Sequence, residues 1–261
     1  MEATRAKEAS DLLIRHWRDG TTLVALPEPL RPADRAEGYR VQAHVESLSG
    51  KPLFGWKIAA TSEAGQRHIA VDGPIAGRLL AEMVFPDRAT LTLGANRMRV
   101  AEAEFAFRMG RDLPPRDRPY DRDEVLGAVA ALHLAVEVPD SRFSDFTRAG
   151  VAQLIADNAC AHQFVLGPEA PPAWRGLDLA AHAVTGRVET RLVREGCGAN
   201  VLGDPRLALV WLVDELSRHD ETLAEGQVVT TGTCLIPLDV EPGDHVSVDY
   251  GRLGRIDVRF A

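Results

Sequence analysis

The stretch Val100-Ala101-Glu102-Ala103-Glu104-Phe105-Ala106-Phe107 carries the strongest structural and chemical signal in this chain. Residues two apart along a β-strand share a face, so the pattern predicts one apolar face and places Glu102 and Glu104 together on the other. Adjacent carboxylates repel each other, and both are costly to bury unless a positive charge lies between them. The pattern therefore predicts a strand with a cation-binding pair of acids. The alternative is a solvated sheet face with ordinary surface acids.

A third acid extends this set. Glu137 lies in another strand-like apolar run, Leu134–Val138. Three carboxylates from two strands form the kind of oxygen ligand set that holds Mg²⁺ or Mn²⁺ and leaves coordination positions open for a substrate. We therefore expect Glu102, Glu104 and Glu137 to bind one divalent metal ion.

Lys57 is the candidate acid–base group. It lies among apolar residues in Phe54–Ile58, in a chain whose only other lysines are Lys7 and Lys51 among 30 basic residues. A buried ammonium loses proton affinity and becomes useful for proton transfer near neutral pH, unless a nearby carboxylate restores that affinity. The alternative is a structural lysine whose stem packs at the sheet edge while its charge reaches water.

The composition of the chain limits the class of protein. With 261 residues, 45% hydrophobic and 26% charged, the chain can bury a large core, with or without a smaller helical addition. A net charge of −8 gives no electrostatic footprint for nucleic-acid binding. Three widely spaced cysteines argue against a disulfide framework or a zinc site. No run resembles a signal peptide or a membrane span, so we expect a cytoplasmic protein with no membrane partner.

The order of the predicted elements indicates an α+β fold. Residues 1–50 form an N-terminal helical region, with helices predicted near 4–18 and 32–48. Residues 51–261 form a β-rich catalytic domain. The predicted strands cover residues 53–60, 76–85, 97–109, 131–138, 176–189, 227–231, 245–250 and 255–260.

Two later helices and one loop complete the predicted organisation. A helix over 121–132 follows from the capping box that Asp121 and Glu124 form ahead of an apolar run. A second helix is predicted over 205–218. The proline-containing loop 111–122 directly follows the acid-bearing strand, so it is a candidate lid.

Several motifs together resemble the fumarylacetoacetate hydrolase superfamily, in its hydratase/decarboxylase branch. The segment Gly55–Ser62 is similar to G-x-K-[IVM]-G-x-T-S, and Glu102–Phe107 is similar to E-x-E-[IF]-A-F. The motifs keep the family's order over nearly the whole chain, which makes the set far more specific than any one of them. The further matches are Val136–Arg142 (V-E-[IV]-x-[DG]-S-R), Ile155–Ala159 (the A-D-N-A turn), Val201–Pro205 before a long helix, Thr231–Thr233, and Val240–Asp244.

The resemblance implies a mixed, strongly rolled β-sheet core with flanking helices, assembled into a homo-oligomer. It also implies Mg²⁺ or Mn²⁺ at Glu102, Glu104 and Glu137, and a small-molecule substrate: a 2-hydroxy-dienoate or its 2-keto tautomer from aromatic compound catabolism. A 2-keto acid can chelate such an ion, which then stabilises an enolate as a Lewis acid. Lys57 is the expected catalytic residue. The expected substrate-binding residues are Thr61, Ser62, Arg78, Cys160 and Thr233.

Three departures from the family pattern bear on the reaction. Ile75 stands where hydratases of the branch typically carry the second Asp of D-x-P-D-x-G, and the decarboxylases resemble this chain more closely there. An isoleucine cannot transfer a proton. Cys160 stands where A-D-N-A is commonly followed by serine. Arg78 could add a cation that favours a second substrate carboxylate; the alternative is a surface arginine in an arginine-rich chain.

We expect a metal-dependent lyase that hydrates a 2-hydroxy-2,4-dienoate, a hydratase of the 2-keto-4-pentenoate type. One alternative is decarboxylation of a 2-keto-dioate of the 4-oxalocrotonate type, and another is C–C hydrolysis of an acylpyruvate. The non-enzyme alternative is a catalytically silent scaffold of the family. Metal binding separates the last from the others, because a silent relative has no reason to hold Mg²⁺ with three acids.

Overall fold

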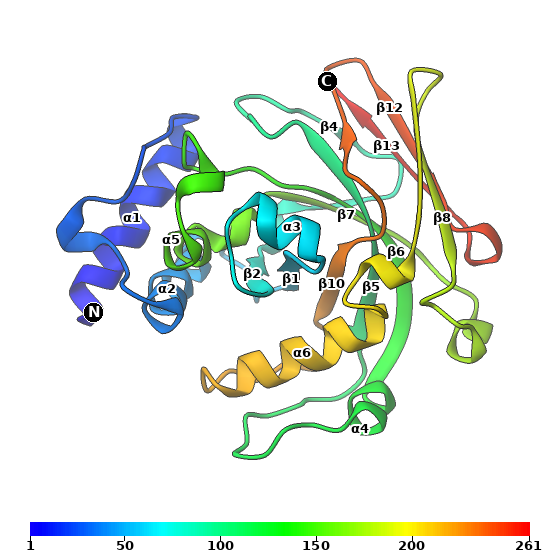
Figure 1. Cartoon of the computed structure of the whole chain (residues 1–261), viewed down its shortest axis with the longest axis horizontal. Coiled ribbons are helices and arrows are strands. Elements are labelled where there is room, and N and C mark those ends of the chain that lie inside the picture. Colours follow the sequence, from blue (N-terminus) through cyan, green and yellow to red (C-terminus); the bar gives the residue numbers. More distant parts are fainter.

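The strands of this chain form two sheets (Figure 1), and the computed structural model describes residues 1–261. The larger sheet has the order β2-β1-β10-β5-β6-β7-β3, and the smaller sheet has the order β4-β13-β12-β8-β9. The larger sheet consists of β1 (Gly55–Ala59), β2 (Ile75–Leu79), β3 (Val84–Pro86), β5 (Val100–Met109), β6 (Val129–Val138), β7 (Gln163–Glu169) and β10 (Val228–Thr233), with β11 (Leu238–Asp239) paired to the start of β5. The smaller sheet consists of β4 (Thr90–Leu91), β8 (Ala183–Val188), β9 (Leu192–Cys197), β12 (His245–Asp249) and β13 (Arg255–Phe260).

The larger sheet is mixed and rolled. β1 pairs with β10 and β3 with β7 in parallel, whereas its other neighbours are antiparallel. Its two edge strands, β2 and β3, are consecutive in the chain, and Leu79 and Val84 at their facing ends share one apolar cluster. We call the side of the sheet that carries this cluster the inner face. The cluster comprises Leu79, Ala106, Ala135, Phe164 and Val228, with Phe54, Val84 and Leu166 packed against it.

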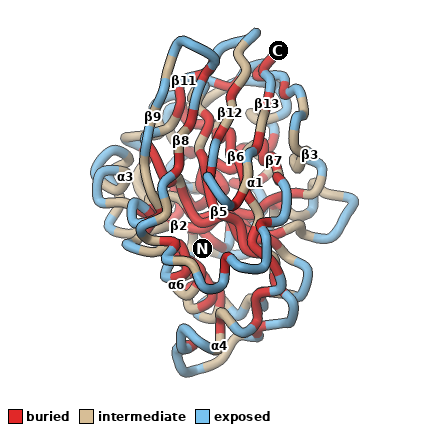
Figure 2. The backbone as a smooth tube through the Cα atoms, turned by 90° about the vertical axis from the view of Figure 1, so that its right-hand side faces the viewer, coloured by how far each residue is buried: buried red, intermediate tan, exposed pale blue.

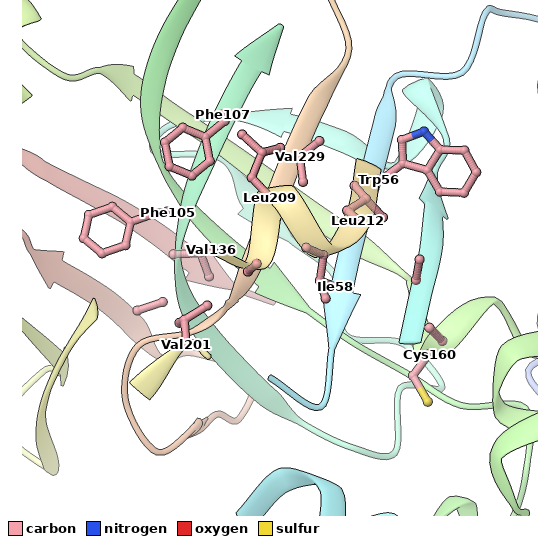
Figure 3. Close-up of a cluster of buried hydrophobic side chains, with 14 of the residues drawn as sticks. Trp56, Ile58, Phe105, Phe107, Val136, Cys160, Val201, Leu209, Leu212 and Val229 are labelled. Carbon is pink, nitrogen blue, oxygen red and sulfur yellow. The ribbon is translucent and has the colours of Figure 1, made fainter. Parts of the chain in front are cut away.

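The outer face of the larger sheet carries the main core. The ring of Phe105 packs edge-on against Tyr250 beside the smaller sheet, with 5.3 Å between ring centroids. Phe107 packs against Trp174 at 5.9 Å. Figure 3 shows both phenylalanine rings on the same side of their strand, and Figure 2 shows the buried backbone concentrated in the two sheets. The alternation in β5 therefore separates the apolar core from the acids, as the sequence predicts.

The N-terminal helices gather beside the edge strand β2 (Figure 1). Gln42 fixes them there, because its side-chain Nε2 donates to the carbonyl of Ala76 at 2.7 Å and to that of Ile155 at 2.9 Å. No helix of the structure has the length and apolar character needed to cross a bilayer. The helices are α1 (Ala3–Asp19), α2 (Arg35–Gln42), α3 (Glu63–His68), α4 (Arg122–Gly127), α5 (Val151–Ala156) and α6 (Pro205–Ser217).

Two predicted helix boundaries are wrong for identifiable reasons. The helix predicted from residue 32 begins at Arg35, because the Asp34 side chain caps it by accepting from the Glu37 N–H at 2.8 Å. The helix predicted over 121–132 ends at Gly127. The apolar residues from Val129 onward belong to β6, where they pair with β5.

The loop 111–122 lies away from the acids, so its prediction as a lid is also wrong. It follows Met109, seven residues beyond Glu102 along β5, which is roughly 23 Å at about 3.3 Å per residue. The Tyr120 N–H donates to the side chain of Asp214 in α6 at 3.0 Å. The loop is therefore packed on α6 at the opposite end of the strand.

Candidate metal centre

Three carboxylates meet on the inner face of the larger sheet. Glu102 and Glu137 are direct cross-strand partners, and Glu104 is the next inner-face residue of β5. One oxygen of each residue lies within 4.8 Å of the corresponding oxygens of the other two. Glu104 and Glu137 are fully buried and Glu102 is half-buried, so the group opens toward the Glu102 end of the strand.

The hydrogen bonds leave some of these oxygens without partners. Glu104 Oε2 accepts from the Thr230 hydroxyl and from the Gly232 N–H, the latter at 2.7 Å. Glu104 Oε1 and Glu137 Oε1 accept no hydrogen bond, and Glu137 Oε2 has only the ammonium of Lys57, 3.0 Å away. Buried polar atoms are normally paired, so this donor set fits a divalent cation, which binds such oxygens directly.

The pKa values of the three acids also favour a bound cation. Burial raises the pKa of Glu137 to about 7, although Lys57 opposes the shift. Burial, together with the charges of Glu137 and Glu102, raises the pKa of Glu104 well above its ordinary value. Burial also raises the pKa of Glu102. Without a cation the three groups cannot all be ionised at neutral pH at low cost.

Lys57 lies against this group. Its side chain is almost completely buried, and Nζ is 3.0 Å from Glu137 Oε2 and 3.0 Å from the Ala159 carbonyl oxygen. Burial alone would lower the pKa of Lys57, but the three nearby carboxylates raise it above its ordinary value. The nearby carboxylates therefore restore the proton affinity that the buried amine of Lys57 would otherwise lose.

Thr61 and Thr233 lie beside the irregular end of β10 that binds Glu104. Gly232 has φ of 99°, and a Cβ added there would lie 2.1 Å from Thr61 Oγ1, so Thr61 packs directly on this glycine. The hydroxyl of Thr233 donates to the Leu235 carbonyl at 2.7 Å. Ser62 lies next to this group in sequence, but its hydroxyl caps α3 by accepting from the Gly65 N–H at 3.1 Å.

Arg78 lies on the opposite face of the sheet from Lys57, so the expectation that it adds a cation to the pocket needs correction. In the register of β1 and β2, Arg78 is opposite Trp56, and its guanidinium stacks over the Trp56 ring at 4.5 Å. It is buried and paired with Glu46 and Glu221. Its charge is therefore used to join the N-terminal region to the turn after α6.

Ile75 and Cys160 are both on the side of the acids. Ile75 is buried and shares the inner face of β2 with Gly77, which pairs with Lys57. Cys160 is buried in the turn after α5, where burial and the charge of Asp157 raise its pKa to about 12. Cys160 is therefore a neutral thiol at physiological pH and not a nucleophile.

Two groups of this centre were missed by sequence reasoning. Thr230 binds Glu104 through its hydroxyl, and its position two residues along β10 from Gly232 was the available signal. Ala159 contributes only a main-chain carbonyl to Lys57, which leaves no signal in its side chain.

Comparison with known proteins identifies relatives of this chain. The family model described as fumarylacetoacetate (FAA) hydrolase C-terminal matches residues 67–261. The chain is 32% identical to 2-keto-4-pentenoate hydratase 1 of Dechloromonas aromatica (strain RCB), covering 97% of this chain and 96% of that protein. It is 30% identical to the TodF product hydratase of Pseudomonas putida (strain F1), covering 98% and 95%.

A solved structure shares the fold over the whole length. It is 4-oxalocrotonate decarboxylase from Pseudomonas putida G7, complexed with magnesium and adipate. The TM-score is 0.90 at 24% sequence identity, covering 100% of this chain and 99% of that chain. This likeness confirms the α+β architecture with its rolled sheet.

Proposed function

Because the chain belongs to the fumarylacetoacetate hydrolase family, we propose that it is a divalent-metal-dependent lyase that hydrates a 2-hydroxy-2,4-dienoate to a 4-hydroxy-2-keto acid. The observation that carries this proposal is the buried group of Glu102, Glu104 and Glu137 with Lys57 3.0 Å from it. Two relatives named as hydratases match nearly the whole chain and support the reaction. Such dienoates arise from ring cleavage, so the activity belongs to aromatic compound catabolism.

The residues present would hold Mg²⁺ or Mn²⁺ through the three carboxylates. When bound, the ion would supply Lewis acidity at the carboxylate and 2-keto oxygens of the substrate. The chain's own contribution is to fix these ligands. The Thr230 hydroxyl and the Gly232 N–H hold one oxygen of Glu104, which leaves its second oxygen free to face the ion.

Lys57 binds the substrate carboxylate, because the nearby acids keep its amine protonated. As an ammonium it has three N–H donors, of which one goes to the Ala159 carbonyl and one faces Glu137, so one remains for the substrate. Ketonisation transfers the enol proton to C5 of the dienoate. Conjugate addition then places the hydroxyl of water on C4 and its proton on C3.

Decarboxylation of a 2-keto-dioate is the second candidate, and Ile75 favours it. The inner face offers an apolar side chain where hydration would gain from an acid, and loss of CO₂ requires only the stabilised enolate. Arg78 argues against this candidate. It is paired on the outer face and cannot bind the second carboxylate of a dioate.

Product analysis of the purified protein separates these candidates. Chelator-stripped protein is incubated with 2-hydroxypenta-2,4-dienoate or with a 2-keto-dioate, with and without Mg²⁺ or Mn²⁺. We expect metal-dependent formation of the 4-hydroxy-2-keto acid from the dienoate. Stoichiometric CO₂ release without net hydration would replace the hydratase by the decarboxylase, and full activity in excess chelator would remove the metal from the mechanism.

We further propose that the protein acts in the cytoplasm as a homo-oligomer. The three cysteines are free, and two of them are buried, which fits a reducing compartment. Light scattering of the purified protein tests the assembly that the family resemblance implies, and a monomeric mass would contradict it.

A further inference from the structure

A short turn lies in space between the segment that follows Glu137 and the edge strand β2, which pairs with the strand that carries Lys57. The turn, residues 157–160, follows α5, and all four of its residues are buried. Asn158, Ala159 and Cys160 have φ of 54°, 50° and 60°. Three consecutive non-glycine residues in the left-handed region are unusual, and such a conformation persists only where its surroundings hold it.

On one side, the segment that follows β6 holds the turn through Asp157. Asp157 is buried and accepts from the Ser141 hydroxyl at 2.7 Å, from the Arg142 N–H at 3.0 Å, and from the Arg142 guanidinium. Ser141 and Arg142 lie four and five residues after Glu137. The segment that carries the acid therefore sets the position of the turn directly.

On the other side, Asn158 docks the turn on the edge of β2. Its Oδ1 accepts from the Arg78 N–H at 2.6 Å, and its Nδ2 donates to the Arg78 carbonyl at 2.9 Å. The side-chain amide thus pairs with the free edge of the sheet in the way that a neighbouring strand would. Gly77 makes this approach possible, because a Cβ there would lie 2.3 Å from the Asn158 carbonyl oxygen.

The two contacts together place the Ala159 carbonyl 3.0 Å from Lys57 Nζ. Lys57 is opposite Gly77 in the register of β1 and β2, so a turn held against this part of β2 also lies over the amine. We propose that Asn158 is a positioning residue: its amide docks the turn on β2 and thereby holds the Ala159 carbonyl against Lys57, so that the amine stays at the acid group. This inference rests on the proposed function only for the role of Lys57 in turnover.

The test removes the amide without straining the backbone. Asn158→Gly deletes both bonds to Arg78 and still allows a positive φ. Gln153→Ala is the matched control. Gln153 is a buried amide in α5 that bonds the Leu26 N–H and the Ala149 carbonyl, so its loss destabilises the same region without touching the turn.

The first readout is the reactivity of the lysine amine. Acetic anhydride labelling followed by peptide mass spectrometry is simple here, because the chain has only Lys7, Lys51 and Lys57, and Lys51 is exposed. We expect Lys57 to be labelled at least fivefold faster in Asn158→Gly than in the parent, relative to Lys51. At the same folded fraction, Gln153→Ala should stay within twofold of the parent. Unchanged protection of Lys57 in Asn158→Gly would overturn the proposal.

The second readout is steady-state turnover of the dienoate. We expect kcat of Asn158→Gly to fall at least tenfold, with KM and the calorimetric Kd for Mg²⁺ within threefold of the parent. Faster labelling without a loss of kcat would overturn the positioning role. Should Asn158→Gly not fold, Asn158→Asp keeps the bond from the Arg78 N–H and is read in the same way. A parent protein without turnover would refute the proposed function, whereas the labelling would still decide the position of Lys57.

Discussion

Replacing Gly232 by alanine tests whether a main-chain N–H builds the metal centre. The residue has φ of 99°, and the added Cβ would lie 2.1 Å from Thr61 Oγ1 and 3.0 Å from Thr61 Cβ. An ordinary contact needs at least about 3.4 Å, so either Thr61 or the end of β10 must move by roughly an ångström. Thr61 is buried and branched at Cβ, so the end of β10 has to give way. The Gly232 N–H then leaves Glu104 Oε2.

The expected magnitudes follow from these contacts. The positive φ costs alanine about 1–2 kcal/mol, and the overlap adds about 1–3 kcal/mol. Gly203→Ala is the matched control, because Gly203 has φ of 82° but nothing within 4 Å of an added Cβ. The difference between the variants isolates the overlap and corresponds to roughly 2–10 °C in Tm for a chain of this size. Loss of a hydrogen bond to a charged group, about 1.5–3 kcal/mol, should weaken Mg²⁺ binding about tenfold or more in Gly232→Ala alone.

Differential scanning calorimetry and isothermal titration with Mg²⁺ measure both effects. If Gly232→Ala binds Mg²⁺ as tightly as Gly203→Ala does, the N–H of Gly232 has no part in orienting Glu104. If the two variants also unfold at the same temperature, Thr61 moves aside without cost and the packing described here is wrong.

Three further outcomes are expected. Glu104→Gln should raise the calorimetric Kd for Mg²⁺ at least a hundredfold and abolish turnover. Retained activity would show that Glu104 is not a metal ligand. Lys57→Ala should keep its fold while kcat falls at least a hundredfold; a rate within threefold, about 0.7 kcal/mol of barrier, would leave Lys57 no role in turnover. Glu215 in α6 has an altered pKa: burial alone would raise it, but His219 and neighbouring arginines lower it to about 2. The ionised carboxylate therefore stabilises the fold fully above pH 4.5, and this contribution is lost as the pH falls toward 2. Chemical unfolding between pH 6 and pH 2.5 should show this loss, up to about 3 kcal/mol, in the parent and not in Glu215→Gln; equal slopes would contradict it.

The acid strand was predictable because its chemistry and its period coincide. The alternation in residues 100–107 has a single reading as a strand, and the apolar face fixes where Glu102 and Glu104 point. The alternation does not specify which residues of a neighbouring strand lie opposite the acids. That Glu102 lies opposite Glu137 depends on the antiparallel pairing of β5 and β6, which no local pattern specifies.

The errors have the same origin. Arg78 was expected to add a cation near the pocket, but it is one residue out of step with Ile75 and Gly77 and points to the other face of β2. Four strands were not predicted at all, and two of them, β4 and β11, have only two residues each. β7 contains Gly167 and Pro168, which normally interrupt strands, and β9 is a charged edge strand with little apolar pattern.

Main-chain contributions were invisible for a different reason. The N–H of Gly232 and the carbonyl of Ala159 act on Glu104 and Lys57 through atoms that every residue possesses. Only their geometry, a positive φ in both cases, distinguishes them. Sequence reasoning therefore named the acids and the lysine that the structure brings together, and it missed the backbone groups that orient them.

The apolar cluster on the inner face limits where the tail of a substrate can lie. Ala135 is opposite Glu104 in the register of β5 and β6, Phe164 is opposite Glu137 in the register of β6 and β7, and both are buried. Glu102 is the half-exposed member of the acid group. Apolar side chains therefore occupy the inner face beside the two buried acids. A dienoate that is held at the acids and has a longer tail should carry that tail toward the Glu102 side.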